Sequence, residues 1–262
     1  MTNSAIIQWH NELKALSAYV YDIQKNKLPE GYKILFDDYN PNSGFYGCVV
    51  KKGNDVVIVY RGTELKDIKD FSNDKQLLDK KNPNQAKDAM YLYNLAEQYC
   101  SNNNLFLTLT GHSLGGSLAE IVGAKTGTAT VTFNAYGVRD VLKESEIKYE
   151  NNITNYCSKT DYTITRINAD KHVGKCYVVP SSNSVFSHFI GFMGDLSQAQ
   201  EIDPKYLDTG RVIKSRIEQE KNKVMSVINK NNCTGSYQVS GYTRSDGTRV
   251  DSYVRNCYIH GR

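Results

Sequence analysis

The run T-L-T-G-H-S-L-G-G-S-L-A at residues 108–119 constrains the fold of this 262-residue chain more than any other segment. Residues 105–110 alternate apolar and small polar side chains, as a buried strand does. Apolar residues at helical spacing then follow the run's serine: Leu118, Ile121 and Val122. A strand, a sharp turn and a helix in immediate succession predict an α/β fold with a mostly parallel central sheet.

Ser113 stands at the turn itself, with Gly111 and Gly115 on either side in the spacing G-x-S-x-G. Glycines at these positions let the backbone turn tightly while the hydroxyl projects outward, which is the layout of a nucleophile elbow. The helix N-terminus faces the hydroxyl, so the Leu114 N–H is the natural first donor to an oxyanion. The five-residue spacing alone occurs by chance in many proteins, and the strand and helix around it make it specific.

A nucleophilic serine needs an orienting acid, which in this kind of fold follows it in the chain and precedes the base. Residues 153–157 read as a short strand, and Asp161 comes just after it. The carboxylate would then lie in the loop at the carboxyl end of a strand, where α/β sheets keep their chemistry. The simpler interpretation is that Asp161 only caps a turn.

The base should come from one of the histidines that follow the acid: His172, His188 and His260. His172 precedes the strand-like residues 176–179 and so lies at their wrong end. His188 follows the same strand and a loop, and it opens an apolar, helix-like run. His260 lies in a tail that reads as a separate unit. We therefore favour His188 as the base. The simpler interpretation is that His188 only packs beside its aromatic neighbours.

A second oxyanion donor should come from a loop after an earlier strand. Residues 45–50 and 56–60 read as a hairpin, and the second strand runs into Gly62 and Thr63. Thr63 could offer its N–H and its hydroxyl to an anionic oxygen. An ordinary strand-ending turn explains the same spacing.

Several motifs together resemble the class 3 lipase superfamily, and within it a bacterial, phospholipase-like branch. The resemblance spans roughly residues 10–195 and implies an α/β-hydrolase fold. The motifs that carry it are Tyr60-Arg61-Gly62-Thr63, Gly111-His112-Ser113-Leu114-Gly115-Gly116, Phe133-Asn134-Ala135-Tyr136-Gly137, and Asn155-Tyr156 followed by Asp161.

The resemblance implies that Ser113 is the nucleophile, Asp161 the acid and His188 the base, with Thr63 and Leu114 as the oxyanion hole. It also implies that residues 65–82, which mix apolar and charged side chains, form a lid over an acyl groove, although a structured surface loop with a buried apolar edge is the simpler interpretation. Tyr60 stands where the family usually has Phe, and Tyr162 where it often has Pro. Neither change removes a chemical group that the reaction needs.

Composition divides the chain into three parts: a catalytic domain at 1–202, an amphipathic helical connector at 203–231 and a small β-hairpin tail at 232–262. No run approaches the ~18 apolar residues of a membrane-spanning helix. Residues 4–22 predict a helix that covers the core, without the basic start of a signal peptide. We expect a cytoplasmic protein, or one exported by a route independent of an N-terminal signal peptide.

The net charge of +4 is too small to indicate nucleic-acid binding, but its distribution is uneven. Residues 203–262 hold eleven basic and six acidic side chains. They could meet anionic lipid, or form a solvated helix face. Asp246-Gly247 between two tyrosine-bearing segments predicts a hairpin, which could bind a protein partner.

The six cysteines are too few for a disulfide framework. Cys48 and Cys100 should be buried thiols. The sequence does not decide whether disulfides join Cys157 to Cys176 and Cys233 to Cys257. No cysteine and histidine spacing suits zinc, and we expect neither a metal nor a cofactor.

These observations predict a serine acyl-ester hydrolase of the lipase or phospholipase A type, acting on a lipid or phospholipid at a membrane surface. A thioesterase or acyltransferase would share every catalytic residue. The sequence is also compatible with a toxin or effector that uses lipase chemistry. A non-catalytic binding module that uses the basic tail would belong to a different class of protein.

Overall fold

The computed structural model describes residues 3–62, 83–159, 161, 171–181 and 188–202, and four short strands between residues 236 and 256. The chain divides into two compact units, residues 1–212 and residues 213–262. The site candidates that the structure describes all belong to the first unit.

Within the described residues, one eight-stranded sheet organises the first unit, and its strands lie in the order of the sequence. The five strands from β3 to β7 are parallel, and β1, β2 and β8 add antiparallel edges. The mostly parallel α/β sheet is therefore as predicted. The strands are β1 (Lys33–Asn40), β2 (Phe45–Lys52), β3 (Asp55–Tyr60), β4 (Phe106–His112), β5 (Ala129–Phe133), β6 (Ile153–Ser158), β7 (Lys175–Val179) and β8 (Gln200–Ile202).

The predicted hairpin at residues 45–60 is confirmed, because β2 pairs antiparallel with β3 across a two-residue turn. Gly53 in that turn has a φ of 58°, which a residue without a side chain adopts at little cost. The apolar runs of β2 and β3 are buried on both faces, as the central strands of a covered sheet must be.

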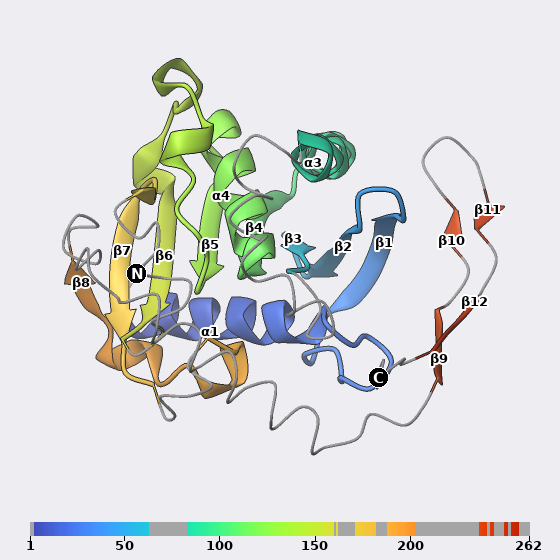
Figure 1. Cartoon of the computed structure of the whole chain (residues 1–262), viewed down its shortest axis with the longest axis horizontal. Coiled ribbons are helices and arrows are strands. Elements are labelled where there is room, and N and C mark those ends of the chain that lie inside the picture. Colours follow the sequence, from blue (N-terminus) through green and yellow to red (C-terminus); the bar gives the residue numbers. More distant parts are fainter. Residues whose placement is uncertain are drawn as a thin grey trace, which may run out of the picture. The chain divides into compact units, whose positions relative to one another are not determined.

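Helices cover the two faces of the sheet in separate layers (Figure 1). Helix α1 packs on one face, and α3 and α4 pack on the other. The helices are α1 (Asn3–Tyr19), α3 (Pro83–Asn103) and α4 (Leu114–Thr126), with short 3-10 turns η3 (Arg139–Val141), η4 (Glu144–Glu146), η5 (Glu150–Asn152), η7 (Ile190–Phe192) and η8 (Leu196–Gln198).

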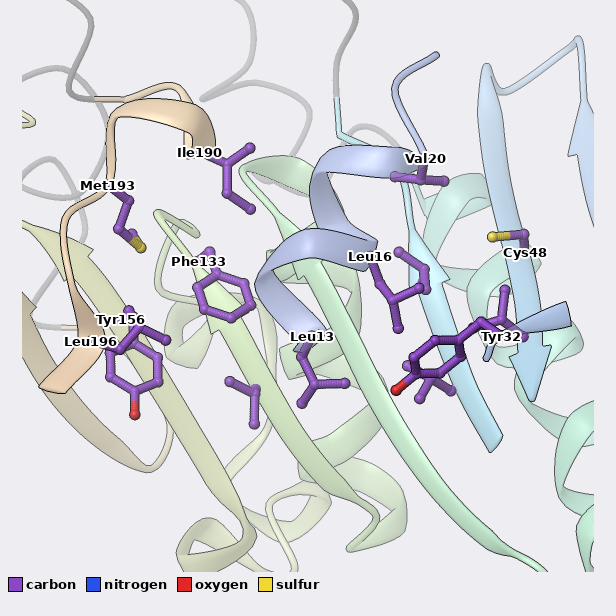
Figure 2. Packing of buried hydrophobic residues seen from close by; sticks show 14 of the residues in the cluster. Leu13, Leu16, Val20, Tyr32, Cys48, Phe133, Tyr156, Ile190, Met193 and Leu196 are labelled. Carbon is purple, nitrogen blue, oxygen red and sulfur yellow. The ribbon is translucent and has the colours of Figure 1, made fainter. Parts of the chain in front are cut away.

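Helix α1 is the covering helix that the sequence predicts. Leu13 and Leu16 are fully buried, and Figure 2 shows them directed at the sheet side chains beneath. Phe133 from β5 and Tyr156 from β6 stack in the same cluster, with ring centroids 5.8 Å apart. This packing ties the N-terminal segment to the strands that carry the candidate site.

The apolar run after His188 is shorter as a helix than its composition suggests. It forms only the 3-10 turn η7, because Met193 leaves the turn to make an isolated bridge with Ser181. Gly191 within the run also lowers its helical propensity.

Cys48, Cys100, Cys157 and Cys176 are buried free thiols. Cys176 pairs with Asn155 and not with Cys157, so the two cysteines on β6 and β7 are diagonal neighbours. Diagonal neighbours are further apart than a disulfide usually allows. Cys233 and Cys257 lie outside the described residues.

In the second unit, β10 (Tyr242–Thr243) pairs antiparallel with β11 (Arg249–Val250), which is the pairing that the predicted hairpin requires. The strands β9 (Ser236–Val239) and β12 (Tyr253–Asn256) pair outside it. The expected connector helix lies outside the described residues. None of the helices that the structure describes is both long and apolar enough to cross a membrane.

Candidate active site

The candidate residues follow the carboxyl ends of five neighbouring parallel strands. Gly62 follows β3, Ser113 follows β4, Asn134 follows β5, Asp161 follows β6 and His188 follows β7. Because these strands lie side by side in one sheet, their carboxyl ends share one edge. Residues that are far apart in the sequence therefore converge there.

Ser113 sits in the strained turn that the sequence predicts. It connects β4 directly to α4 with a φ of 57° and a ψ of −130°, which few residues other than glycine adopt. Its N–H donates to the Phe133 carbonyl at 3.0 Å. A Cβ on Gly115 would lie 2.1 Å from the Tyr60 carbonyl oxygen, so only glycine lets α4 approach the end of β3 this closely.

The structure brings Ser113, His188 and Asp161 together in one hydrogen-bonded series. The Nε2 of His188 lies 3.0 Å from the Ser113 Oγ, and its Nδ1 lies 2.7 Å from the Asp161 Oδ2. The side chains are largely shielded from water, with residue exposures of 4% for Ser113, 8% for His188 and 1% for Asp161. A carboxylate only accepts hydrogen bonds, so Nδ1 carries the proton and Nε2 is left to accept the serine proton.

Leu114 begins α4, and its N–H is therefore among the helix N-terminal donors that have no partner within the helix. The helix dipole adds positive potential at the same point. Thr63 and the expected lid at residues 65–82 lie outside the described residues. Gly62, the residue before Thr63, lies against the elbow, since a Cβ there would come within 3.2 Å of the Ser113 Cβ.

Three residues that sequence reasoning did not assign to the site also meet there. The main-chain oxygen of His188 accepts hydrogen bonds from His112 Nε2 at 2.7 Å and from Asn134 Nδ2 at 2.8 Å. The hydroxyl of Tyr21 lies 2.8 Å from the other ring nitrogen of His112. His112 and Asn134 stand inside motifs that the sequence analysis noted, whereas Tyr21 follows α1 and carries no local signal.

His112 is neutral in this environment. Burial disfavours its charged form, and the neighbouring His188 adds to the effect, so that the pKa of His112 falls to about 3. The two imidazole rings lie 4.9 Å apart between centroids. A neutral neighbour avoids repelling the positive charge that His188 would acquire as a base.

His172, the other candidate base, lies elsewhere. It precedes β7, and its Nδ1 lies 2.8 Å from the Glu120 Oε2 on α4, with both side chains fully buried. Burial works against the imidazolium, but the Glu120 carboxylate outweighs it and, together with the Cys157 thiol, raises the pKa of His172 to about 10. His172 thus forms a buried ion pair at the amino end of its strand.

In the described part of the chain, no three His, Cys, Asp or Glu side chains are grouped as a metal ion would require. The groups that this edge of the sheet brings together are a hydroxyl, an imidazole and a carboxylate beside a helix N-terminus.

A family model described as a Tle-like phospholipase domain, of the phospholipase-like group, matches residues 12–169, which is more than half of the chain. The matched segment includes the elbow, Asn134 and Asp161. No curated protein sequence matches the chain.

Solved lipase structures share the fold. A triacylglyceride lipase of Rhizomucor miehei superposes with a TM-score of 0.54 at 15% identity, covering 75% of this chain and 98% of that one. The propeptide complex of Rhizomucor miehei lipase gives 0.52 at 17% identity, covering 74% and 82%. A triacylglycerol lipase whose catalytic centre is a serine protease triad gives 0.51 at 16%, covering 68% and 82%. The fold is accordingly that of the α/β-hydrolases.

Proposed function

Since this chain belongs to the Tle-like phospholipase family, we propose that it is a serine acyl-ester hydrolase of the phospholipase A or lipase type. The observation that carries the proposal is the unbroken series of hydrogen bonds from Asp161 through His188 to Ser113. The serine protease triad of one structural neighbour supports the same assignment of roles here.

In the acylation step, His188 Nε2 removes the proton from Ser113 as the Oγ attacks the ester carbonyl carbon. Asp161 holds Nδ1 protonated and stabilises the imidazolium that forms. The new oxyanion meets the Leu114 N–H at the start of α4. The imidazolium then protonates the leaving alcohol, which would be a lysophospholipid or a glyceride, and Ser113 keeps the acyl group.

Deacylation reuses the same groups on water. Neutral His188 takes a proton from a water molecule, whose oxygen attacks the acyl carbon. Collapse of the second tetrahedral intermediate returns the proton to the Ser113 Oγ and releases a fatty acid. The cycle therefore ends with the triad in its starting protonation state.

The decisive experiment is mass analysis of the products released from phospholipids with two different acyl chains. A free fatty acid together with a lysophospholipid supports a phospholipase A, and the identity of the released chain gives the bond. A panel of thioesters and acyl acceptors separates a thioesterase and an acyltransferase from an ester hydrolase. Failure to release acyl groups from any ester, with no labelling of Ser113 by a fluorophosphonate, would favour a non-catalytic binding module.

Thr63 remains a predicted second oxyanion donor. Thr63→Val deletes a hydroxyl and keeps the N–H, so kcat should fall about 10²-fold to 10³-fold if the hydroxyl contributes. KM should change little, because the oxyanion forms only after the substrate is bound. Steady-state kinetics on a soluble ester measure both quantities. An unchanged kcat would assign the donor role to the backbone alone.

We propose that the basic C-terminal part directs the enzyme to anionic lipid. Residues 200–202 form β8 on the edge of the sheet, so a truncation that spares the fold should follow Val212, the end of the first unit. That truncation should preserve hydrolysis of a short soluble ester and weaken hydrolysis of anionic vesicles.

The difference between the two substrates should shrink as salt is added, because exposed charges are screened over about 10 Å at 0.1 M salt. Hydrolysis of neutral vesicles is the matched control. Equal losses of activity on the soluble ester and on the vesicles would mean that the removed segment supports the fold. The proposal that this segment directs the enzyme to anionic lipid would then be wrong.

A further inference from the structure

We propose that His112, Asn134 and Tyr21 are positioning residues that hold His188 in reacting geometry through its main-chain carbonyl. The inference rests on the proposed function, because it assigns His188 the role of base. Two side-chain donors converge on this one oxygen, His112 Nε2 at 2.7 Å and Asn134 Nδ2 at 2.8 Å. A carbonyl oxygen has two lone pairs, and these two donors can occupy both.

The contact fixes the tautomer of His112. A carbonyl only accepts, so His112 Nε2 must carry the hydrogen. In the neutral ring Nδ1 then has a lone pair, which accepts from the Tyr21 hydroxyl at 2.8 Å. The Tyr21 hydroxyl can donate or accept, so the carbonyl is what fixes the tautomer, and Tyr21 stabilises this form of His112 by donating to Nδ1. Loss of the Tyr21 hydroxyl would leave the buried Nδ1 without this hydrogen bond and would loosen the hold on the ring.

Asn134 connects the base to the acid. Its Nδ2 donates to the His188 carbonyl, and its Oδ1 accepts from the Ser158 N–H at 2.7 Å. The Ser158 carbonyl in turn accepts from the Asp161 N–H at 3.1 Å. The φ of Asn134 is 45°, a left-handed conformation that asparagine tolerates better than most residues. The fully buried Asn134 amide thus joins the end of β6 to the His188 segment.

His112 connects the base to the nucleophile in the same way, because it immediately precedes Ser113 in the elbow. The three reacting side chains are thereby linked through one main-chain oxygen: the nucleophile through the adjacent His112, and the acid through Asn134 and Ser158. A misplacement of about 1 Å costs on the order of 10²-fold in rate, so this network should control kcat.

Two substitutions of His112 distinguish its role as a hydrogen-bond donor from its role in packing. In His112→Gln the amide Nε2 is as many bonds from Cβ as the histidine Nε2, so it can still donate to the carbonyl. In His112→Asn the amide reaches only the position of Nδ1. We expect kcat on a soluble p-nitrophenyl ester to fall about 10²-fold in His112→Asn and to stay within about tenfold in His112→Gln, with KM nearly constant in both.

Tyr21→Phe has a matched control elsewhere in the molecule. The Tyr156 hydroxyl also lies 2.8 Å from a histidine Nδ1, that of His10, and both pairs have edge-to-face rings 5.6 Å apart. The pair of His10 and Tyr156 lies outside the network around the His188 carbonyl. We expect Tyr21→Phe to lower kcat about tenfold, the worth of one hydrogen bond, and Tyr156→Phe to leave kcat unchanged.

A readout that needs no turnover keeps this proposal separate from the proposed function. The proton between His188 Nδ1 and Asp161 should give a strongly deshielded resonance in the proton NMR spectrum, assigned by its loss in His188→Ala. It should shift or broaden in His112→Asn and Tyr21→Phe but not in Tyr156→Phe. If the wild type hydrolyses no ester and the resonance still responds to the variants as described, the proposed function is wrong. The positioning role is then still supported.

The positioning role is wrong if a folded, active protein shows equal kcat and an unmoved resonance in His112→Asn. It is also wrong if His112→Gln and His112→Asn lose activity to the same extent, because packing and not donation would then be the cause.

Discussion

Ser113→Ala is expected to lower kcat for ester hydrolysis by about 10⁶-fold, to the level left by the remaining groups of the site. Alanine removes the hydroxyl oxygen that lies 3.0 Å from His188 Nε2, and no acyl-enzyme can then form. His188→Ala should cost about as much, because the two residues act as one unit. Steady-state kinetics and fluorophosphonate labelling measure the loss.

Both variants should keep the melting temperature of the wild type within a few degrees, since neither side chain anchors the core. His172→Ala is the contrasting control, because it should retain the chemistry of the folded molecules while lowering their stability. An inactive but stable His172→Ala, together with an active His188→Ala, would reverse the assignment of the base.

The second large effect concerns the buried pair of Glu120 and His172. Glu120→Leu should lower the free energy of unfolding by about 3 to 5 kcal/mol, because it leaves a buried imidazole and the Val173 N–H without their carboxylate partner. The double variant Glu120→Leu with His172→Leu should recover the part of the loss that comes from the unpaired imidazole, since apolar side chains replace both charges, but not the part that comes from the Val173 N–H. Chemical denaturation of four proteins, the wild type, Glu120→Leu, His172→Leu and the double variant, measures the coupling energy between the two side chains.

The same pair predicts a pH dependence of stability. The pKa of His172 is about 10 in the folded protein and ordinary in the unfolded chain. Its contribution is therefore complete below about pH 6.5 and is lost as the pH rises through about 10. The wild type should lose more stability over this interval than the double variant. Parallel curves for the two proteins would show that the pair is not ionised.

The elbow could be predicted from the sequence because every part of it is local. A strand, a serine between glycines and a helix are encoded within about a dozen consecutive residues, and their periodicities need no tertiary information. The structure shows this pattern as a positive φ at Ser113 and a close approach of Gly115 to the main chain of Tyr60. The order of Ser113, Asp161 and His188 also follows from a parallel sheet whose strands are added in sequence order.

The choice between His188 and His172 could be argued only from which end of a strand each occupies. Tertiary structure decided their contacts. Asp161 meets His188 across 27 residues, whereas Glu120 on the helix after the nucleophile meets His172 across 52. Both pairs join a histidine to a carboxylate, and no local pattern distinguishes a pair at the reacting edge from one buried at the far end.

The sequence by itself determined the fold class, the elbow and the candidate acid and base, because each depends on short-range periodicity or on chain order along the sheet. Only the tertiary structure decided which hydrogen bonds hold the elbow and the base in position. Tyr21 reaches His112 from 91 residues away, and Asn134 reaches the His188 carbonyl from 54 residues away. Hydrogen bonds that a side chain makes to a residue far away in the sequence leave no periodic pattern, since they depend on where whole strands and helices lie in the fold.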